Sequence, residues 1–221
     1  MGAIERRTSV DVGEIPVSEA GWGYEVAKRC LDVAVSAALL IILTPLLIPI
    51  ALAIRIDSRG PVFYRRRVVG RGGKSFRAFK LRTMVENGDP QIAQNKRLLD
   101  EFNSNHKLEV DPRVTRVGKA LRKTSTDELP QLINVLRGEM SLVGPRMISF
   151  PELEKFGEWQ ERILQVKPGI TGLWQVRGRS DLDYEERVRL NVYYVTHRSL
   201  ALDLWILAKT IPVVISGRGA Y

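Results

Sequence analysis

The chain has 221 residues and a net charge of +9, from 34 lysines and arginines against 25 aspartates and glutamates. Apolar residues make up 44% of the sequence, which excludes a disordered chain. A single cysteine, Cys30, excludes a disulfide framework, and two distant histidines add too little for an ordinary zinc site. Any chemistry must therefore rest on carboxylates, hydroxyls and basic groups.

The first third of the sequence predicts a tail followed by a membrane anchor. Residues 1–24 are polar and carry several glycines and a proline, so we expect a flexible N-terminal tail there. The anchoring segment is expected over residues 25–56, and within it residues 33–54 form a run of 22 residues without a charge. As a straight helix this run would reach about 33 Å, enough to cross a hydrocarbon core of about 30 Å.

Two features argue against a simple spanning helix. Pro45 and Pro49 lie inside the run, where each removes a backbone donor, and Thr44 can compensate by bonding a backbone carbonyl. Lysines and arginines flank both ends of the run, whereas a spanning helix usually has them concentrated on one side. We therefore expect a re-entrant helix that breaks at Thr44 and Pro45 and returns to its starting face. A kinked spanning helix and a buried core helix are the alternatives.

Positive charge is concentrated in residues 55–82, which hold ten basic residues and one acid. This net charge of nine equals the excess of the whole chain, and it indicates either an anionic partner or a solvated surface. Because the basic stretch follows an apolar run, an anionic lipid membrane is the expected partner and nucleic acid is not. Glycines at positions 70, 72 and 73 precede an alternating run at 76–81, which predicts a β-hairpin rather than a nucleotide-binding loop.

Residues 123–138 predict a helix with an acidic pair at its start. Four apolar residues recur there at helical spacing, Ser125 or Thr126 can cap the first turn, and Gly138 can end the helix. Asp127 and Glu128 then lie at the positive end of the helix dipole, which favours the ionised carboxylates. Acids in a first turn often only stabilise the helix, so the pair is not by itself specific for catalysis.

Groups suited to phosphate flank this acidic pair in the sequence. Arginine forks match phosphate oxygens, and neighbouring glycines and prolines hold loops at a fixed geometry. Two carboxylates among several arginines are expected where a divalent cation meets a diphosphate, although a set of surface ion pairs would have the same composition. The candidate substrate-binding residues are Arg82, Arg113, Arg122, Arg146, Gln175, Arg177 and Arg179.

A second apolar stretch, residues 200–215, contains Asp203, Lys209 and Pro212. It is too polar to span a membrane and is typical of an interfacial or core helix. Together these features predict a mainly α fold with a small β-hairpin. In that fold a re-entrant membrane helix carries a compact domain, residues 57–221, with interfacial amphipathic helices.

Six motifs occur in a specific order along the chain. They are KRCLDV, FRAFKLRTM, DPRVTRVG, LRKTSTDELPQLINVLRGEMSLVGPR, VKPGITGLWQVRGRSDLDYEERV and GRGAY. Together they resemble the bacterial sugar transferases, the monotopic phosphoglycosyl transferases that start polysaccharide synthesis. The resemblance covers about residues 25–221 and implies a small form of the family, in which residues 57–221 are the catalytic domain.

The resemblance implies a two-step covalent mechanism. Asp127 would attack the β-phosphorus of a UDP-sugar and release UMP, and polyprenyl (undecaprenyl) phosphate would then accept the sugar phosphate. Mg²⁺ would be held by Glu128 with Asp127, and Arg122 and Arg146 would lie near the diphosphate. The usual Gly-Pro-Arg-Pro of the family has methionine in its last position here, and the usual Ser-Pro of the membrane helix is Thr44-Pro45.

The resemblance also implies a cellular role. It indicates exopolysaccharide or O-antigen synthesis at the bacterial inner (cytoplasmic) membrane, with the active site facing the cytoplasm and with glucose or galactose as the expected sugar. A homodimer on the membrane surface is compatible with it. The alternative is a non-enzymatic membrane-surface adaptor, which would use the anchor and the basic stretch but would leave Asp127 and Glu128 unexplained.

Overall fold

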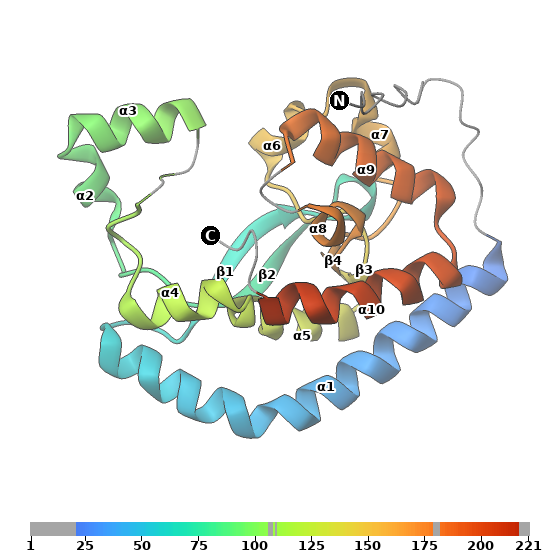
Figure 1. The fold of residues 1–221 in the computed structure, drawn as a ribbon, viewed down its shortest axis with the longest axis horizontal. Coiled ribbons are helices and arrows are strands. Elements are labelled where there is room, and N and C mark those ends of the chain that lie inside the picture. The colour runs from blue at the N-terminus through green and yellow to red at the C-terminus, as the bar shows by residue number, and fades with distance from the viewer. Residues whose placement is uncertain (1–20, 106–107, 109, 179–181, 217–221) are drawn as a thin grey trace, which may run out of the picture.

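The computed structural model describes residues 21–105, 108, 110–178 and 182–216. One long helix, α1 (Trp22–Asp57), runs beneath a mostly helical body formed by the rest of the chain (Figure 1). The mainly α architecture is therefore confirmed. The helix begins slightly before the predicted anchor at residue 25, and residues 1–20 of the predicted tail lie outside the described part of the chain.

The predicted break in the membrane segment is a bend and not an interruption. α1 stays helical through Pro45 and Pro49, and Thr44 Oγ1 donates a hydrogen bond of 2.6 Å to the carbonyl of Leu40, one turn earlier. The helix bends near its middle, so that its two ends lie toward the body and its centre bows away (Figure 1). Prolines are the usual cause of such bends because they remove an intrahelical hydrogen bond.

Most of the apolar surface of α1 is not covered by the chain itself. Only 6% of its most apolar 18-residue window is buried, and the side chains of Ile41 and Ile48 are 76% and 67% exposed. The interpretation as a buried core helix is therefore wrong. By length and composition α1 is able to cross a membrane.

The predicted hairpin is confirmed. Strands β1 (Phe63–Val69) and β2 (Ser75–Leu81) pair antiparallel, with Phe63 opposite Leu81 and Val69 opposite Ser75. The short 3-10 helix η2 (Arg71–Gly73) connects them, with Gly72 and Gly73 at φ +67° and +74°. Glycine adopts this left-handed conformation without steric cost, which explains the glycines in the turn.

The remaining elements are short except near the C-terminus. They are α2 (Asp89–Ala93), α3 (Lys96–Asn105), α4 (Arg116–Lys123), η3 (Thr126–Gln131), α5 (Leu132–Leu136), β3 (Ser141–Val143), α6 (Phe150–Glu154), η4 (Gly157–Trp159), α7 (Gln160–Ile163), β4 (Gly169–Thr171), α8 (Leu173–Arg177), α9 (Tyr184–His197) and α10 (Leu200–Ser216). α2 and α3 form an arm that stands apart from the body (Figure 1). The helix predicted at 200–215 is confirmed as α10.

A second sheet was not predicted. β3 and β4 pair in parallel, with Ser141 opposite Gly169 and Val143 opposite Thr171. A side chain at Gly169 would begin 2.1 Å from the backbone nitrogen of Gly144, so the two chain segments approach as closely as they do only because glycine is present.

The core lies where the hairpin, α5, the parallel pair, α9 and α10 converge. Its largest fully buried apolar side chains are those of Met140, Tyr194 and Ile206, and Val68 and Ala78 of the hairpin join the same cluster. Residues of α1 that include Leu39 and Leu43 pack against it from below. The core thus fixes the hairpin and α5 relative to each other, and these two elements frame the site.

Candidate active site

Asp127 and Glu128 lie in η3, a 3-10 helix, and not in the first turn of an α-helix as predicted. Ser125 precedes η3 in the left-handed conformation and makes no side-chain cap. Pro130 has no N–H to donate along the helix, which disfavours the α-helical pattern over this segment. Regular α-helix begins only with α5, and Gly138 ends it at φ +78°, as predicted.

The buried side-chain amide of Asn134 connects α5 to β2, the second strand of the hairpin. Asn134, which is fully buried in α5, accepts a hydrogen bond of 2.9 Å from the backbone N–H of Phe79 and donates one of 2.9 Å to the carbonyl of Arg77. Both partners belong to β2, so these bonds fix the position of the strand relative to α5 and to the acidic pair in the preceding η3. Lys80 is the next residue of that strand.

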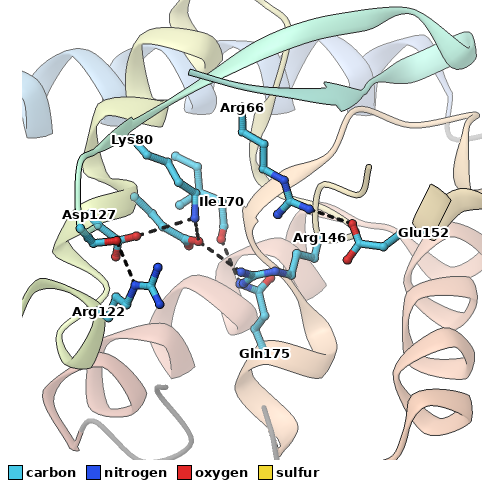
Figure 2. Close-up of polar contacts among 10 residues, drawn as sticks. Arg66, Lys80, Arg122, Asp127, Arg146, Glu152, Ile170 and Gln175 are labelled. Atoms are coloured by element: carbon cyan, nitrogen blue, oxygen red, sulfur yellow. Dashed lines mark hydrogen bonds and ion pairs between the residues drawn. The ribbon is translucent and has the colours of Figure 1, made fainter. Parts of the chain in front are cut away.

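Lys80 connects the hairpin to both carboxylates. Its Nζ lies 2.7 Å from Glu128 Oε1 and 3.7 Å from Asp127 Oδ2, and all three side chains are largely shielded from solvent. Arg146 Nη2 lies 3.3 Å from the same Glu128 oxygen. Figure 2 shows the Lys80 side chain reaching toward Asp127 from above, with Arg122 below Asp127 and Arg146 to the right. Two acids and three cations therefore share one small region.

Burial raises the pKa of Asp127, and this effect outweighs the surrounding cations. Lys80, Arg122 and Arg146 each oppose the shift, whereas Glu128 adds to it. The predicted stabilisation of the ionised form by a helix terminus is therefore not the dominant effect. A carboxylate that is poorly solvated in this way is more basic and more reactive toward an electrophile than one in water.

Of the predicted arginines, Arg122 and Arg146 are the two that the fold brings to the acidic pair. Arg122 donates a hydrogen bond of 2.9 Å from Nε to Thr83 Oγ1, just beyond β2, which orients its guanidinium beside Asp127. Arg146 follows β3, and its guanidinium carbon lies 5.9 Å from the centre of the Trp174 ring. Both arginines are thus held by neighbours in addition to their charge partners.

Two other predicted arginines have structural partners. Arg82 is 7% exposed, and its guanidinium donates to the carbonyls of Ile54, Ser58 and Arg59, where α1 ends. This arrangement caps the helix, so the contacts that the structure gives Arg82 are structural, and its predicted contact with substrate stays a prediction. Arg113 forms a two-pronged ion pair with Asp111, with nitrogen–oxygen distances of 3.0 and 2.8 Å.

The remaining predicted residues lie in or next to α8. Gln175 donates a hydrogen bond of 3.1 Å to the carbonyl of Ile170, and its own side-chain oxygen is buried without a partner in the described part of the chain. Arg177 is exposed and stacks over Trp205 of α10, 5.4 Å from the ring centre. Arg179 lies outside the described residues.

Lys80, Thr83 and Trp174 contact the acidic pair or its arginines but are not among the residues predicted from the sequence. A signal for Lys80 was available, because strand alternation places it on the same face as Ala78, which is fully buried. Lys80 also belongs to the basic stretch, residues 55–82, for which the sequence predicts a contact with lipid. Thr83 and Trp174 gave no comparable signal, since their roles depend on contacts with segments distant in sequence.

A divalent cation would have to rely on the acidic pair and on its substrate. Within residues 21–105, 108, 110–178 and 182–216, no group of three or more histidine, cysteine or acidic side chains is placed to hold a metal ion. Magnesium sites often use only one or two carboxylates and complete their shell with water and substrate phosphates. Asp127 and Glu128 fit a magnesium site of this kind, with two carboxylates. Lys80 already places a positive charge beside both of them.

Known proteins are similar to this chain in sequence over nearly its whole length. A family model for bacterial sugar transferases matches residues 23–217. The exopolysaccharide production protein ExoY of Sinorhizobium fredii is 44% identical over 200 residues, which cover 89% of this chain and 88% of ExoY. The undecaprenyl-phosphate galactose phosphotransferase of Salmonella typhimurium is 46% identical over 198 residues, 88% of this chain and 41% of that protein.

A third relative carries a different sugar in its name. The UDP-glucose:undecaprenyl-phosphate glucose-1-phosphate transferase of Caulobacter vibrioides is 41% identical over 207 residues, covering 89% of this chain and 73% of that protein. These similarities place the chain among transferases and exclude a non-enzymatic adaptor. The chain belongs to the bacterial sugar transferase family and is an enzyme.

Proposed function

We propose that this enzyme transfers a sugar 1-phosphate from a UDP-sugar to polyprenyl phosphate through a covalent intermediate on Asp127. The observation that carries the proposal is the buried Asp127 carboxylate, held beside Glu128 and Lys80 and between Arg122 and Arg146. Relatives named for transfer of galactose phosphate and glucose 1-phosphate to an undecaprenyl carrier support this chemistry. Glucose or galactose is therefore the proposed sugar, and exopolysaccharide synthesis the proposed pathway.

In the first step Asp127 acts as the nucleophile. An Oδ atom attacks the β-phosphorus of the UDP-sugar, which is the phosphorus that carries the sugar. The bond from that phosphorus to the bridging oxygen breaks, and UMP leaves with the oxygen and the electron pair. The sugar phosphate is then joined to the carboxylate as an acyl phosphate.

In the second step polyprenyl phosphate is the nucleophile. One of its phosphate oxygens attacks the same phosphorus, the bond to Asp127 breaks, and the carboxylate is regenerated. The product is polyprenyl diphosphate sugar. Because each step displaces one oxygen at phosphorus by another, no external oxidant, reductant or additional nucleotide is required.

The cations of the site neutralise the charge that both steps carry. Arg122 and Arg146 offer guanidinium forks that match phosphoryl oxygens in geometry. Lys80 is a point charge that holds the acidic pair together before substrate arrives and would remain beside the phosphoryl group during transfer. Glu128 keeps Lys80 and Arg146 in position through ion pairs of 2.7 and 3.3 Å.

Mg²⁺ is the proposed metal, with Glu128 and Asp127 as its protein ligands. When bound, it would supply a further positive charge for the diphosphate. Lys80 Nζ lies 2.7 Å from Glu128 Oε1, so a metal held by both carboxylates would compete with Lys80 for this oxygen. Lys80 would then be able to contact the substrate phosphates.

The membrane arrangement that suits this reaction is a re-entrant α1 in the inner membrane, with the active site facing the cytoplasm. The acceptor phosphate lies at headgroup depth, and both ends of the bent α1 lie toward the body (Figure 1). Seven basic residues that follow the apolar run are exposed, and each would contribute about 1 kcal/mol near an anionic bilayer. These are Arg55, Arg59, Arg65, Arg67, Arg71, Lys74 and Arg77.

Nucleotide release tests the reaction. Purified full-length protein in detergent is supplied with undecaprenyl phosphate, Mg²⁺ and either UDP-glucose, UDP-galactose or an N-acetylhexosamine nucleotide. We expect UMP from one hexose nucleotide, sustained turnover only with the lipid, and no release by Asp127→Asn. A single-turnover reaction without lipid should leave one sugar phosphate on the protein at Asp127. Release of UDP would contradict the proposed mechanism.

Thiol labelling tests the membrane arrangement. Cys30 is the chain's one cysteine and is exposed near the start of α1, and Ser58→Cys introduces a second thiol where α1 ends. In sealed inverted vesicles, a membrane-impermeant maleimide should label both positions if α1 is re-entrant. Labelling of only one position from each side would show a spanning helix. Cys30→Ser combined with Ser58→Cys lets each site be scored separately.

A further inference from the structure

A polar pocket lies at the N-terminal end of α1, and neither Asp127 nor Glu128 lines it. It has a volume of about 40 Å³, and its basic lining residues are Lys28, Arg29, Arg71, Lys167 and Arg198. None of the residues that frame the active site contributes to it. We propose that this pocket binds a phosphate-type anion.

The charges around the pocket do not balance. Five basic side chains line it against two acids, Glu25 and Asp32. Lys28 is already neutralised by Asp203, at 2.8 Å, whereas Arg71 reaches Glu25 only at 3.9 Å. The lining therefore retains an excess of positive charge that a bound anion would neutralise.

Two of the basic groups have donors left over. Within the described part of the chain, the side chain of Lys167 makes no hydrogen bond or ion pair, and the buried Nε of Arg198 has no partner. Arg29 is different, because it donates to the carbonyls of Val135 and Leu136 and so closes the end of α5. An ammonium and a guanidinium with free donors are the groups that bind phosphate oxygens.

The basic groups are also forced together. A side chain at Gly138 would begin 3.7 Å from both Arg29 Nη2 and Lys167 Nζ, so these two cations are near neighbours across a glycine. The pKa of Lys167 is lowered, first by burial and then by the positive charges of Arg29 and Arg71. Like charges held this close in a half-buried pocket favour the binding of an anion between them.

The size and position of the pocket indicate the class of ligand. A cavity that holds one water molecule needs a volume of about 10–15 Å³. The volume of about 40 Å³ therefore admits a group of several atoms, such as a phosphate. Lys28 and Arg29 come just before the 22 uncharged residues of α1. A phosphate at this boundary is available from a phospholipid headgroup or from solution, and the experiment must separate these sources.

Lysine acetylation provides a site-specific test. Full-length protein is held in an uncharged, phosphate-free detergent and phosphate-free buffer, pulsed with an acetylating reagent, and analysed by mass spectrometry of its peptides. Dihexanoyl phosphatidylglycerol and inorganic phosphate are titrated separately, with octyl glucoside as a phosphate-free amphiphile. Lys155, an exposed lysine outside the pocket, is the internal control.

We expect the lipid to slow acetylation of Lys167 at least ten-fold and saturably, with Lys155 changed less than two-fold. Arg71→Gln should raise the lipid concentration needed for half-maximal protection at least five-fold. Arg77→Gln removes an equivalent exposed charge from the same hairpin and should leave that concentration unchanged. Protection by inorganic phosphate at lower concentration than by lipid would support the site and assign its ligand to solution. No protection by either, equal protection by octyl glucoside, or no effect of Arg71→Gln would overturn the proposal.

Discussion

Lys80 Nζ and Glu128 Oε1 lie 2.7 Å apart although 48 positions separate the two residues in the sequence. The contact joins the hairpin to η3, and Asn134 reinforces the same junction through its hydrogen bonds to the backbone of β2. The acidic pair is therefore not a feature of one local motif. It depends on the hairpin, which places a cation over it.

Replacing Lys80 by methionine should inactivate the enzyme. The change leaves two buried carboxylates without their nearest cation, so we expect a fall of at least 100-fold in kcat and a loss of stability of about 1–3 kcal/mol. Lys74→Met removes an exposed lysine from the same hairpin and should change both quantities little. The rate of UMP release gives kcat for the two variants, and thermal unfolding gives their stability. A Lys80→Met enzyme within three-fold of the wild type would show that Lys80 only holds the hairpin in place.

Asp127→Asn should abolish activity without weakening the fold. Burial raises the pKa of Asp127, so the folded protein binds this proton more tightly than the unfolded chain. The stabilisation from the protonated carboxyl is complete below the unfolded pKa of about 3.9 and is lost as pH rises through the higher folded value. Asparagine carries no such dependence.

The apparent Tm of Asp127→Asn, relative to wild type, should therefore increase between about pH 4 and pH 8 when measured without Mg²⁺. Glu154→Gln, which removes an exposed acid, is the control for the change in net charge. A difference that decreases with pH would mean that the cations around Asp127 outweigh its burial.

The sequence predicted the elements of this fold better than their contacts. Alternation and the glycines at 72 and 73 are local signals, and they were sufficient for the hairpin. The parallel pairing of Ser141 with Gly169 has no local signal, because each strand has only three residues. Its stability depends on the close approach of Gly144 to Gly169, which composition alone does not show.

The same limit applies to the candidate site. The order of motifs pointed to Asp127 and Glu128, but composition could not separate an arginine that faces phosphate from one that caps a helix. Arg82 and Arg122 both follow the hairpin as basic residues near polar neighbours, and only the fold shows that Arg82 closes α1. Position in space, rather than residue type, decides between the two roles.

Arg82 and Arg122 should consequently respond in opposite ways to substitution by methionine. Arg82→Met removes the donors for three carbonyls at the end of α1, and we expect a loss of about 2–4 kcal/mol in stability with KM for the UDP-sugar within two-fold of wild type. Arg122→Met should cost less stability and lower kcat/KM at least 100-fold. Thermal unfolding and steady-state kinetics of both variants test this. A large rise in KM for the UDP-sugar in Arg82→Met would indicate that Arg82 contacts the substrate.

Asp203 of α10 should be a principal link between α10 and α1. It is fully buried, ion-paired with Lys28 at 2.8 Å, and accepts hydrogen bonds from Tyr24 and Tyr194 at 3.0 and 2.7 Å. Removing one partner of such a pair leaves an uncompensated charge, so Asp203→Asn should cost about 3–5 kcal/mol. Lys28→Met should be costly for the same reason.

The double variant should be less unstable than the sum of the two single changes, because neither charge is then left alone. We expect a coupling free energy of about 1–3 kcal/mol from the four-member cycle, measured by urea unfolding in detergent. Lys209→Met with Asp203→Asn is the matched cycle, since Lys209 lies on α10 over Trp205 and forms no ion pair with Asp203 in the described part of the chain. Additive costs in the Lys28 cycle would mean that the two tyrosine hydroxyls, and not the ion pair, hold α10 against α1.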